Sequence, residues 1–246
     1  MSGARLDIAG MHKAFGGLKV IDDLSFSARP GSRTALIGPN GAGKTTVFNL
    51  ICGVYALDEG SVKLDQDDLT ALPARKRIAC GMSRSFQNIR LMPHLSTVEN
   101  VMLGEHWRRS PLSLARGRRA QREAEQALRE AGLETYPGQV VANLPYGIQK
   151  RIEVVRALMA RPRLLLLDEP AAGLNTAETD ELRKLLERVS ASGVTLLVVE
   201  HDMHFVRKLC DHVVVLNFGR KIFEGTPDEV HRDPAVLEAY LGGEGI

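Results

Sequence analysis

Residues Gly38 to Thr46 read Gly-Pro-Asn-Gly-Ala-Gly-Lys-Thr-Thr, and this stretch decides how the chain folds. Its first eight residues match the pattern GxxxxGK[ST], in which glycines let backbone N–H groups approach phosphate oxygens. The segment Thr34 to Ile37 reads as a strand and precedes the loop, and a helix is predicted from Gly43 to Cys52. A strand, a glycine-rich loop and a helix therefore follow one another. An unliganded glycine turn is the simpler alternative, but this context favours a nucleotide phosphate-binding loop.

The loop also predicts how each side chain contributes to binding. Lys44 is expected to bridge the β- and γ-phosphates, and Thr45 to offer its hydroxyl to Mg²⁺. Thr46 is expected to add a phosphate contact through its N–H or hydroxyl. The predicted nucleotide-binding residues here are Gly38, Pro39, Asn40, Gly41, Ala42, Gly43, Lys44, Thr45 and Thr46.

Two carboxylates follow an apolar run later in the chain. Leu164 to Leu167 reads as a buried strand, and Asp168 and Glu169 come directly after it. Ligands of open α/β sheets bind at such strand ends. Asp168 is the predicted Mg²⁺ ligand, and Glu169 is placed to polarise a water that attacks the γ-phosphorus. Alone, the pair would read as an ordinary strand end; together with the loop, it predicts ATP hydrolysis.

Composition limits the class of protein. The 246 residues are 44% hydrophobic and 25% charged, as in folded globular proteins. Lysine and arginine total 32 against 30 acidic residues, which argues against nucleic acid as the main partner. The cysteines (Cys52, Cys80 and Cys210) lack the spacing of a zinc site or a disulfide framework, which favours a reducing cytosol. Neither a secretory signal nor an apolar run of about 20 residues is present, so a cytoplasmic chain is expected.

The periodicity predicts an α/β fold. Short strands broken by glycine and proline run from Leu6 to about Leu64, some of them antiparallel. Helices are expected from a capping box at Ser96 and Glu99 onward and from Tyr146 to about Met159. Further predicted elements are a helix at Arg118 to Ala131, a helix at Thr176 to Ser190, and strands at Leu24 to Ala28, Ser61 to Leu64, Thr195 to Val199, His212 to Asn217 and Arg220 to Glu224. Helices that alternate with apolar strands indicate a parallel sheet.

Together with Gln87 in Ser85-Phe-Gln-Asn88, Leu144-Pro-Tyr-Gly147 and His201 in Glu200-His-Asp-Met203, these motifs have the order found in ATP-binding cassette (ABC) ATPases. The chain resembles that family over nearly its whole length. The resemblance implies one domain over residues 1–246. Its core would be RecA-like, with a mixed sheet and an antiparallel β subdomain, over 1–90 and 160–246. A helical signature subdomain would cover about 91–159.

The resemblance also implies roles for individual residues. Gln87 would contact Mg²⁺ and the attacking water and sense the permease, although a polar loop residue is the simpler interpretation. His201 would be the switch histidine near the γ-phosphate, and Phe15 would stack on adenine unless it is only a core residue. Gly147 would contact the nucleotide of a partner subunit.

The signature segment departs from the family pattern Leu-Ser-Gly-Gly-Gln. It reads Leu144-Pro-Tyr-Gly-Ile-Gln149, so Pro145 stands where the family has serine. Proline supplies neither a hydroxyl nor an N–H, which leaves Gly147 and the helix end as phosphate contacts. Pro145 is also a good residue with which to open a helix. Asn175 stands where aspartate is more common, and it forms a predicted capping pair with Glu178.

Three segments narrow the resemblance to the LivG-type ATPases of branched-chain amino-acid importers, a group that includes ATPases for urea or amide uptake. They are Pro170 to Asn175, Glu200 to Met203 and Asp233 to Gly242. The implied partners are a second ATPase subunit, identical or paralogous, integral-membrane permease subunits and, indirectly, an extracytoplasmic solute-binding protein. The implied location is the inner face of the cell membrane. Alternatives are a soluble cassette ATPase and a nucleotide-dependent regulator without hydrolysis.

A basic stretch remains outside these motifs. Its arginines lie between Arg108 and Arg122, beside His106 and Trp107. It is suited to anionic lipid headgroups, but a solvated helix face is the favoured interpretation.

Overall fold

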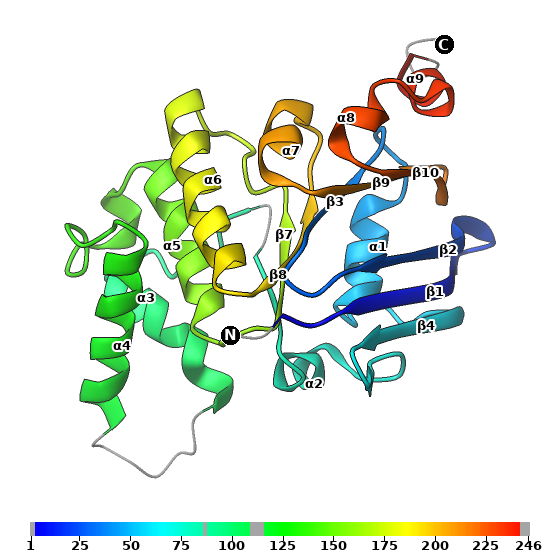
Figure 1. The fold of residues 1–246 in the computed structure, drawn as a ribbon. Helices are drawn as coiled ribbons and strands as arrows, with labels where there is room; N and C mark the ends of the chain where they lie inside the picture. The colour runs from blue at the N-terminus through cyan, green and yellow to red at the C-terminus, as the bar shows by residue number, and fades with distance from the viewer. Residues whose placement is uncertain (1–2, 86–87, 109–115, 242–246) are drawn as a thin grey trace.

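The computed structural model describes residues 3–85, 88–108 and 116–241, in which two sheets are flanked by helices (Figure 1). The strands are β1 (Leu6–Phe15), β2 (Leu18–Ala28), β3 (Arg33–Ile37), β4 (Glu59–Leu64), β5 (Asp67–Asp68), β6 (Met82–Arg84), β7 (Leu164–Asp168), β8 (Thr195–Val199), β9 (His212–Asn217) and β10 (Arg220–Gly225). The helices are α1 (Lys44–Ile51), α2 (Ala74–Ala79), α3 (Thr97–Met102), η1 (Leu103–Arg108), α4 (Arg116–Glu130), η2 (Val141–Asn143), α5 (Tyr146–Leu158), α6 (Thr176–Ala191), α7 (Met203–Leu209), α8 (Pro227–Val230) and α9 (Pro234–Leu241).

The core sheet has the strand order β10-β9-β3-β8-β7-β6. Its neighbours from β9 to β6 run parallel, and only β10 is antiparallel to its neighbour. All residues of β7 and β8 are buried, because helices cover both faces of a parallel sheet. Leu165 and Leu167 pack on the side of α5 and α6, whereas Leu164 and Leu166 pack on the side of α1. The predicted mixed sheet is confirmed.

Helix α1 lies between the core sheet and a second, antiparallel sheet with the order β2-β1-β4-β5 (Figure 1). Phe48 and Leu50 of α1 are fully buried in one cluster with Leu6 of β1 and Leu166 of β7. Each element of this layer buries an apolar face that it could not bury alone. The predicted antiparallel strands near the N-terminus are thus confirmed, and their packing fixes the helix that follows the phosphate loop.

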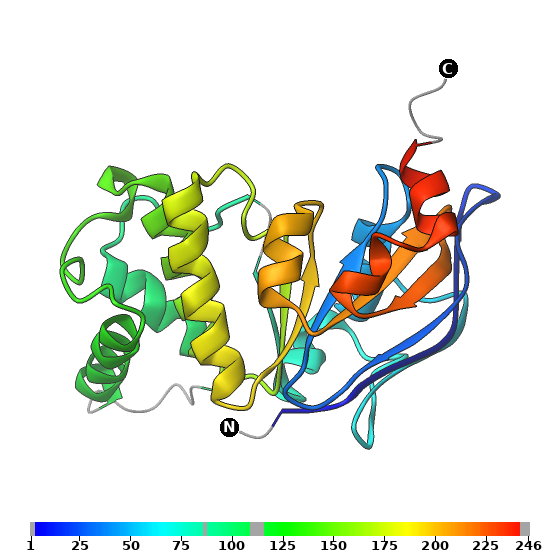
Figure 2. The ribbon, with the colours of Figure 1, turned by 45° about the horizontal axis from the view of Figure 1, so that its top comes forward.

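Helices α3 to α6 form the other side of the molecule (Figure 2). The capping box predicted at Ser96 opens α3: its hydroxyl accepts from the N–H of Glu99, whose carboxylate accepts from the N–H of Ser96. Ala124 and Leu128 of α4 are fully buried, as their helical spacing predicts. Within the described residues, no helix is both long and apolar enough to cross a bilayer.

A buried arginine holds the far end of α1. Arg77 is 2% exposed, and its guanidinium donates to the carbonyl oxygens of Leu50, Ile51 and Leu72 at 2.8, 2.6 and 2.8 Å. The last carbonyls of a helix carry partial negative charge, so a cation there is stabilising. Nothing in the sequence near α1 points to this contact, because it depends on how α2 packs.

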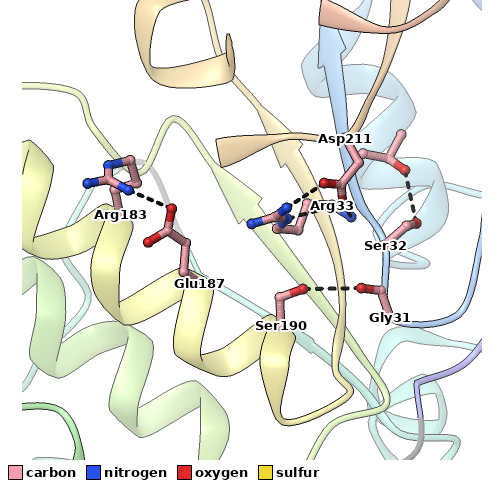
Figure 3. A network of polar contacts seen from close by, with 8 residues as sticks. Gly31, Ser32, Arg33, Arg183, Glu187, Ser190 and Asp211 are labelled. Carbon is pink, nitrogen blue, oxygen red and sulfur yellow. Dashed lines mark hydrogen bonds and ion pairs between the residues drawn. The ribbon is translucent and has the colours of Figure 1, made fainter. Parts of the chain in front are cut away.

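The amino ends of the core strands are joined by the polar network of Figure 3. Arg33, the first residue of β3, donates through Nε to the carboxylate of Asp211 at 3.1 Å, just before β9. Burial acts to raise the pKa of Asp211, but the bonds from Arg33 hold the pKa below its usual value. Ser190 of α6 donates to the carbonyl of Gly31 at 3.1 Å. These contacts occupy the side of the sheet where β3 and β9 begin. The carboxyl ends of the parallel strands lie on the opposite side, which is called the carboxyl edge below.

The structure differs from the sequence expectation at several elements, including the unexpected helices α7 and α9. The strand expected from Leu24 begins at Leu18 and pairs with β1 along its length. No sequence pattern predicted α2 or β6, and β6 has only three residues and pairs on one side with β7. Such short elements are stabilised by their neighbours rather than by their own periodicity.

Candidate functional site

The phosphate loop joins β3 to α1 at the carboxyl edge of the core sheet. Gly38, Gly41 and Gly43 have positive φ angles of 152°, 80° and 100°. A Cβ on Gly38 would lie 2.2 Å from the carbonyl oxygen of Leu216, so no side chain fits there. The N–H of Gly219, in the β9–β10 hairpin, donates to the carbonyl of Ala42 and supports the loop from behind. The backbone therefore requires glycine at the positions that the motif specifies.

Helix α1 begins without a side-chain cap. Its N-cap residue is Gly43, and no side chain accepts a hydrogen bond from the first turn. The first N–H groups of a helix need a partner, and the helix dipole favours an anion there. The start of α1 is thus suited to phosphate oxygens, with Thr45 exposed and Thr46 half-buried beside them.

Lys44 is held by the loop itself. Its ammonium donates to the carbonyl oxygens of Gly38 and Pro39 at 2.6 and 2.9 Å, and the residue is 9% exposed. Burial lowers the pKa of Lys44, and the negative charge of Glu169 acts against that shift. The ammonium therefore already lies inside the loop, with a carboxylate near enough to act on it.

Asp168 ends β7 and is 5% exposed. Its Oδ2 accepts from Arg84 at 2.7 Å, and the same guanidinium donates to Asn49 of α1 at 2.8 Å. The guanidinium carbon also lies 5.3 Å from the ring centre of Phe48. Sequence reasoning missed Arg84, because its role depends on β6 pairing beside β7.

The donors near this edge fit a magnesium ion. Mg²⁺ prefers oxygen ligands and is usually held by one or two protein groups together with water and substrate phosphates. Asp168 and Thr45 offer a carboxylate and a hydroxyl, and the bond from Arg84 engages the Oδ2 atom of Asp168. The described residues contain no cluster of three or more histidine, cysteine or acidic side chains, so an all-protein metal cage is not indicated.

Glu169 and His201 extend from the ends of neighbouring parallel strands, β7 and β8. The structure places Nδ1 of His201 4.0 Å from Oε2 of Glu169, and the His201 side chain is 63% exposed. Glu169 has a φ of 44°, and its N–H donates to the carbonyl of Val199 at 2.9 Å. A left-handed conformation costs a non-glycine residue roughly 1–2 kcal/mol, so the fold imposes this turn.

Phe15 lies at the end of β1 and is 41% exposed. The ring of Tyr55 meets it edge-on with centroids 5.2 Å apart, and the ammonium of Lys13 lies 5.3 Å from its centre. An exposed ring with this support is available for stacking on a base. Tyr55 was not among the sequence candidates.

Gln87 lies outside the described residues.

The signature segment starts α5, on the opposite face of the core sheet from α1. Pro145 is its N-cap and makes no side-chain cap. A Cβ on Gly147 would lie 2.6 Å from the carboxyl group of Glu178, and one on Gly173 would lie 3.2 Å from the ring of Tyr146. The segment therefore packs against the start of α6 rather than joining the phosphate loop of its own chain.

A known protein family matches the part of the chain that contains the phosphate loop, the signature segment and Asp168. The model of the family "ABC transporter" matches residues 21–172. This chain belongs to the ABC transporter ATPase family. A second family, "Branched-chain amino acid ATP-binding cassette transporter", matches residues 220–246.

Individual relatives align with this ABC ATPase over nearly their full length. The high-affinity branched-chain amino acid transport ATP-binding protein BraF of Pseudomonas aeruginosa is 40% identical, covering 98% of this chain and 99% of BraF. The corresponding LivG of Escherichia coli is 37% identical with the same coverage. The ADP conformation of the cassette MJ1267 has a TM-score of 0.89 and 30% identity, covering 98% of this chain and 100% of that one. The chain is thus a cassette of the LivG and BraF type.

Proposed function

We propose that this ABC ATPase binds and hydrolyses ATP to drive the import of branched-chain amino acids through a separate membrane permease. The choice of branched-chain amino acids as the solute is supported by the full-length similarity to BraF and LivG. It is also supported by the C-terminal match to a branched-chain amino acid transporter family. A cassette of the lipopolysaccharide export system, LptB of Escherichia coli, is 31% identical, so the cassette fold alone does not set direction or solute.

Different residues at the carboxyl edge would contact different parts of the bound ATP. Lys44 and the open N–H groups of α1 bind the phosphates, and Lys44 exchanges loop carbonyls for phosphate oxygens. Asp168 and Thr45 would hold Mg²⁺, which would supply positive charge to the phosphate oxygens. Glu169 orients the attacking water, with Gln87 as a second polar contact, and His201 approaches the γ-phosphate. Phe15 stacks on the adenine.

A second cassette completes the site. Gly147 and the start of α5 lie on the opposite face of the core sheet from α1, which suits contact with a nucleotide held by a partner subunit. A related cassette, MJ0796 bound to ADP and Pi, forms a dimer; it is 24% identical, so it supports the fold and not the assembly of this chain. ATP between two copies adds contacts only in the closed form, and hydrolysis removes them.

The permease would dock on a groove beside Arg84. Cys52, Val54, Ile78 and Met82 line this largely apolar groove of about 220 Å³, and Arg84 lies on its wall. Val54 is 56% exposed, so the groove presents apolar surface to a partner. Because Arg84 also binds Asp168, the groove is one side chain away from the proposed metal site. We infer that an apolar segment of the permease binds this surface, and the chain would then work at the inner face of the membrane.

Reconstitution in lipid vesicles tests the proposal. The chain is assembled with its permease and solute-binding protein, and uptake of labelled leucine, isoleucine and valine is measured with and without ATP. We expect ATP-dependent uptake, and Glu169→Gln should abolish it while ATP still binds and traps a closed dimer. ATP hydrolysis without uptake of these three amino acids would contradict the proposed solute. Normal turnover by Glu169→Gln would contradict the role of Glu169.

A further inference from the structure

One buried carboxylate lies outside the roles assigned above. Glu200 follows β8 directly and is 1% exposed. Its Oε1 accepts from the N–H of Ala171 at 2.9 Å, and its Oε2 accepts from the N–H of His201 at 3.1 Å. A carboxylate taken out of water is costly, so one that accepts from an N–H group of each of two loops indicates a specific structural task.

The two loops that Glu200 joins carry the proposed catalytic pair. Glu169 and Ala171 belong to the loop after β7, and His201 belongs to the loop after β8. The N–H of Glu169 donates to the carbonyl of Val199, so the loops are tied once through backbone and once through Glu200. Nδ1 of His201 lies 3.9 Å from Oε2 of Glu200 and 4.0 Å from Oε2 of Glu169.

The loop after β7 also reaches the surface used for the partner. Two residues beyond Ala171, Gly173 lies against the ring of Tyr146, the residue between Pro145 and Gly147. The same loop ends in the Asn175–Glu178 capping box, and Glu178 lies against Gly147. A shift of Ala171 would therefore be felt both at Glu169 and at the start of α5.

We propose that Glu200 is a positioning residue that sets Glu169, His201 and the loop from Ala171 to Asn175 in one arrangement. The inference rests on the proposed roles of Glu169 and His201 in hydrolysis, and not on the solute. It assigns to Glu200 a link between the site in its own chain and the surface that serves the partner's nucleotide. Glu200 acts through backbone N–H groups, so its loss moves the catalytic groups without removing any of them.

The test is Glu200→Gln in the assembled transporter, with ATP hydrolysis measured as kcat and KM. Glutamine keeps the size of the side chain but has one acceptor oxygen, so one of the N–H groups of Ala171 and His201 would face an NH₂ donor. We expect kcat to fall about tenfold or more, because one misplaced hydrogen bond of this kind costs roughly 1.4 kcal/mol or more in the transition state. KM for ATP should stay within about twofold, since Lys44 and the phosphate loop are untouched.

Glu153→Gln is the matched control. Glu153 is a carboxylate of α5, 2% exposed, and it accepts from the N–H of Arg90 at 3.1 Å and from the guanidinium of Arg156 at 3.5 Å. This control should leave the ratio of kcat to KM near the wild-type ratio. An equal loss of kcat in both variants, or wild-type kcat in Glu200→Gln, would overturn the proposal.

A second variant covers a failure of Glu200→Gln to fold. Glu200→Asp is one methylene shorter and cannot reach both loops from the end of β8, so it should show the same selective loss of kcat. Wild-type kcat in Glu200→Asp would also overturn the inference. If the wild-type transporter hydrolyses ATP but does not take up branched-chain amino acids, only the proposed solute fails, and the comparison of kcat values still stands.

Discussion

Helices α1 and α5 both begin without a side-chain cap, yet they begin in different ways. At α1 the N-cap is Gly43, and Lys44 supplies an ammonium that already binds the loop carbonyls. At α5 the N-cap is Pro145, and the nearby Gly147 lies against Glu178. The start of α1 combines a glycine loop with a lysine side chain, whereas the start of α5 offers only backbone and a helix end. Under the proposed function, the phosphate loop would bind the nucleotide of its own chain, and the signature segment would contact the nucleotide of a partner.

Helices α3 and α6, unlike α1 and α5, begin with side-chain caps. Both start with a full capping box, from Ser96 with Glu99 and from Asn175 with Glu178. Their first N–H groups are occupied and cannot serve a ligand. An open start is not enough by itself, since α2 also lacks a side-chain cap behind Pro73. What marks α1 is an open start together with positive-φ glycines and a buried lysine.

Removing the lysine should have the largest effect on this comparison. Lys44→Ala should weaken ATP binding at least roughly 30-fold, because a hydrogen bond between charged groups contributes about 2 kcal/mol or more. Titration calorimetry on the isolated chain measures this directly. Lys184→Ala is the control, because Lys184 lies on α6 and is paired with Glu181 at 2.8 Å. Equal affinity in Lys44→Ala and wild type would remove α1 from the binding site.

Adding a methyl group at Gly147 tests whether the function of α5 requires its start to pack closely against Glu178. Gly147→Ala places a methyl group against Glu178 and should lower kcat of the assembled transporter roughly tenfold, since small misplacements near reacting groups are costly. ATP affinity of the isolated chain should not change. Gly138→Ala is the control, because a Cβ there has open space within 4 Å. Loss of ATP affinity in the isolated Gly147→Ala chain would contradict the separation of the two helix starts.

Restoring the family's serine should make α5 resemble α1 more closely. Pro145→Ser adds a hydroxyl that can reach a phosphate, and it should raise ATP turnover of the assembled transporter by up to about tenfold. The same hydroxyl can cap α5 in the isolated chain and raise its stability by roughly 1 kcal/mol. Turnover at or below the wild-type rate would mean that a missing serine does not limit activity.

Removing a closed cap should have the smallest effect on function. Ser96→Ala should lower the free energy of unfolding by about 1 kcal/mol, measured by urea denaturation, because the N–H of Glu99 loses its acceptor. ATP affinity should match the wild type. A change in affinity would show that capped and open helix starts do not divide structural from binding roles in this chain.

The sequence by itself determined the features that depend on neighbouring residues. The phosphate loop, the alternation of strands and helices and the capping boxes at Ser96 and Asn175 all follow from local spacing. The fold class followed too, because an apolar strand between helices has few ways to bury its faces. The order of motifs then identified the family, which the match over residues 21–172 confirms.

Only the tertiary structure decided which side chains meet across elements. Arg84 reaches Asp168 because β6 pairs with β7, and Glu200 reaches Ala171 because β8 lies beside β7. The contact between Gly147 and Glu178 likewise needs α5 packed on α6. Such contacts join residues far apart in the chain, 84 positions for Arg84 and Asp168 and 178 positions for Arg33 and Asp211, and no local pattern encodes them. A buried carboxylate or guanidinium gains its meaning only from the groups that the fold brings to it, because burial makes each of its hydrogen bonds obligatory.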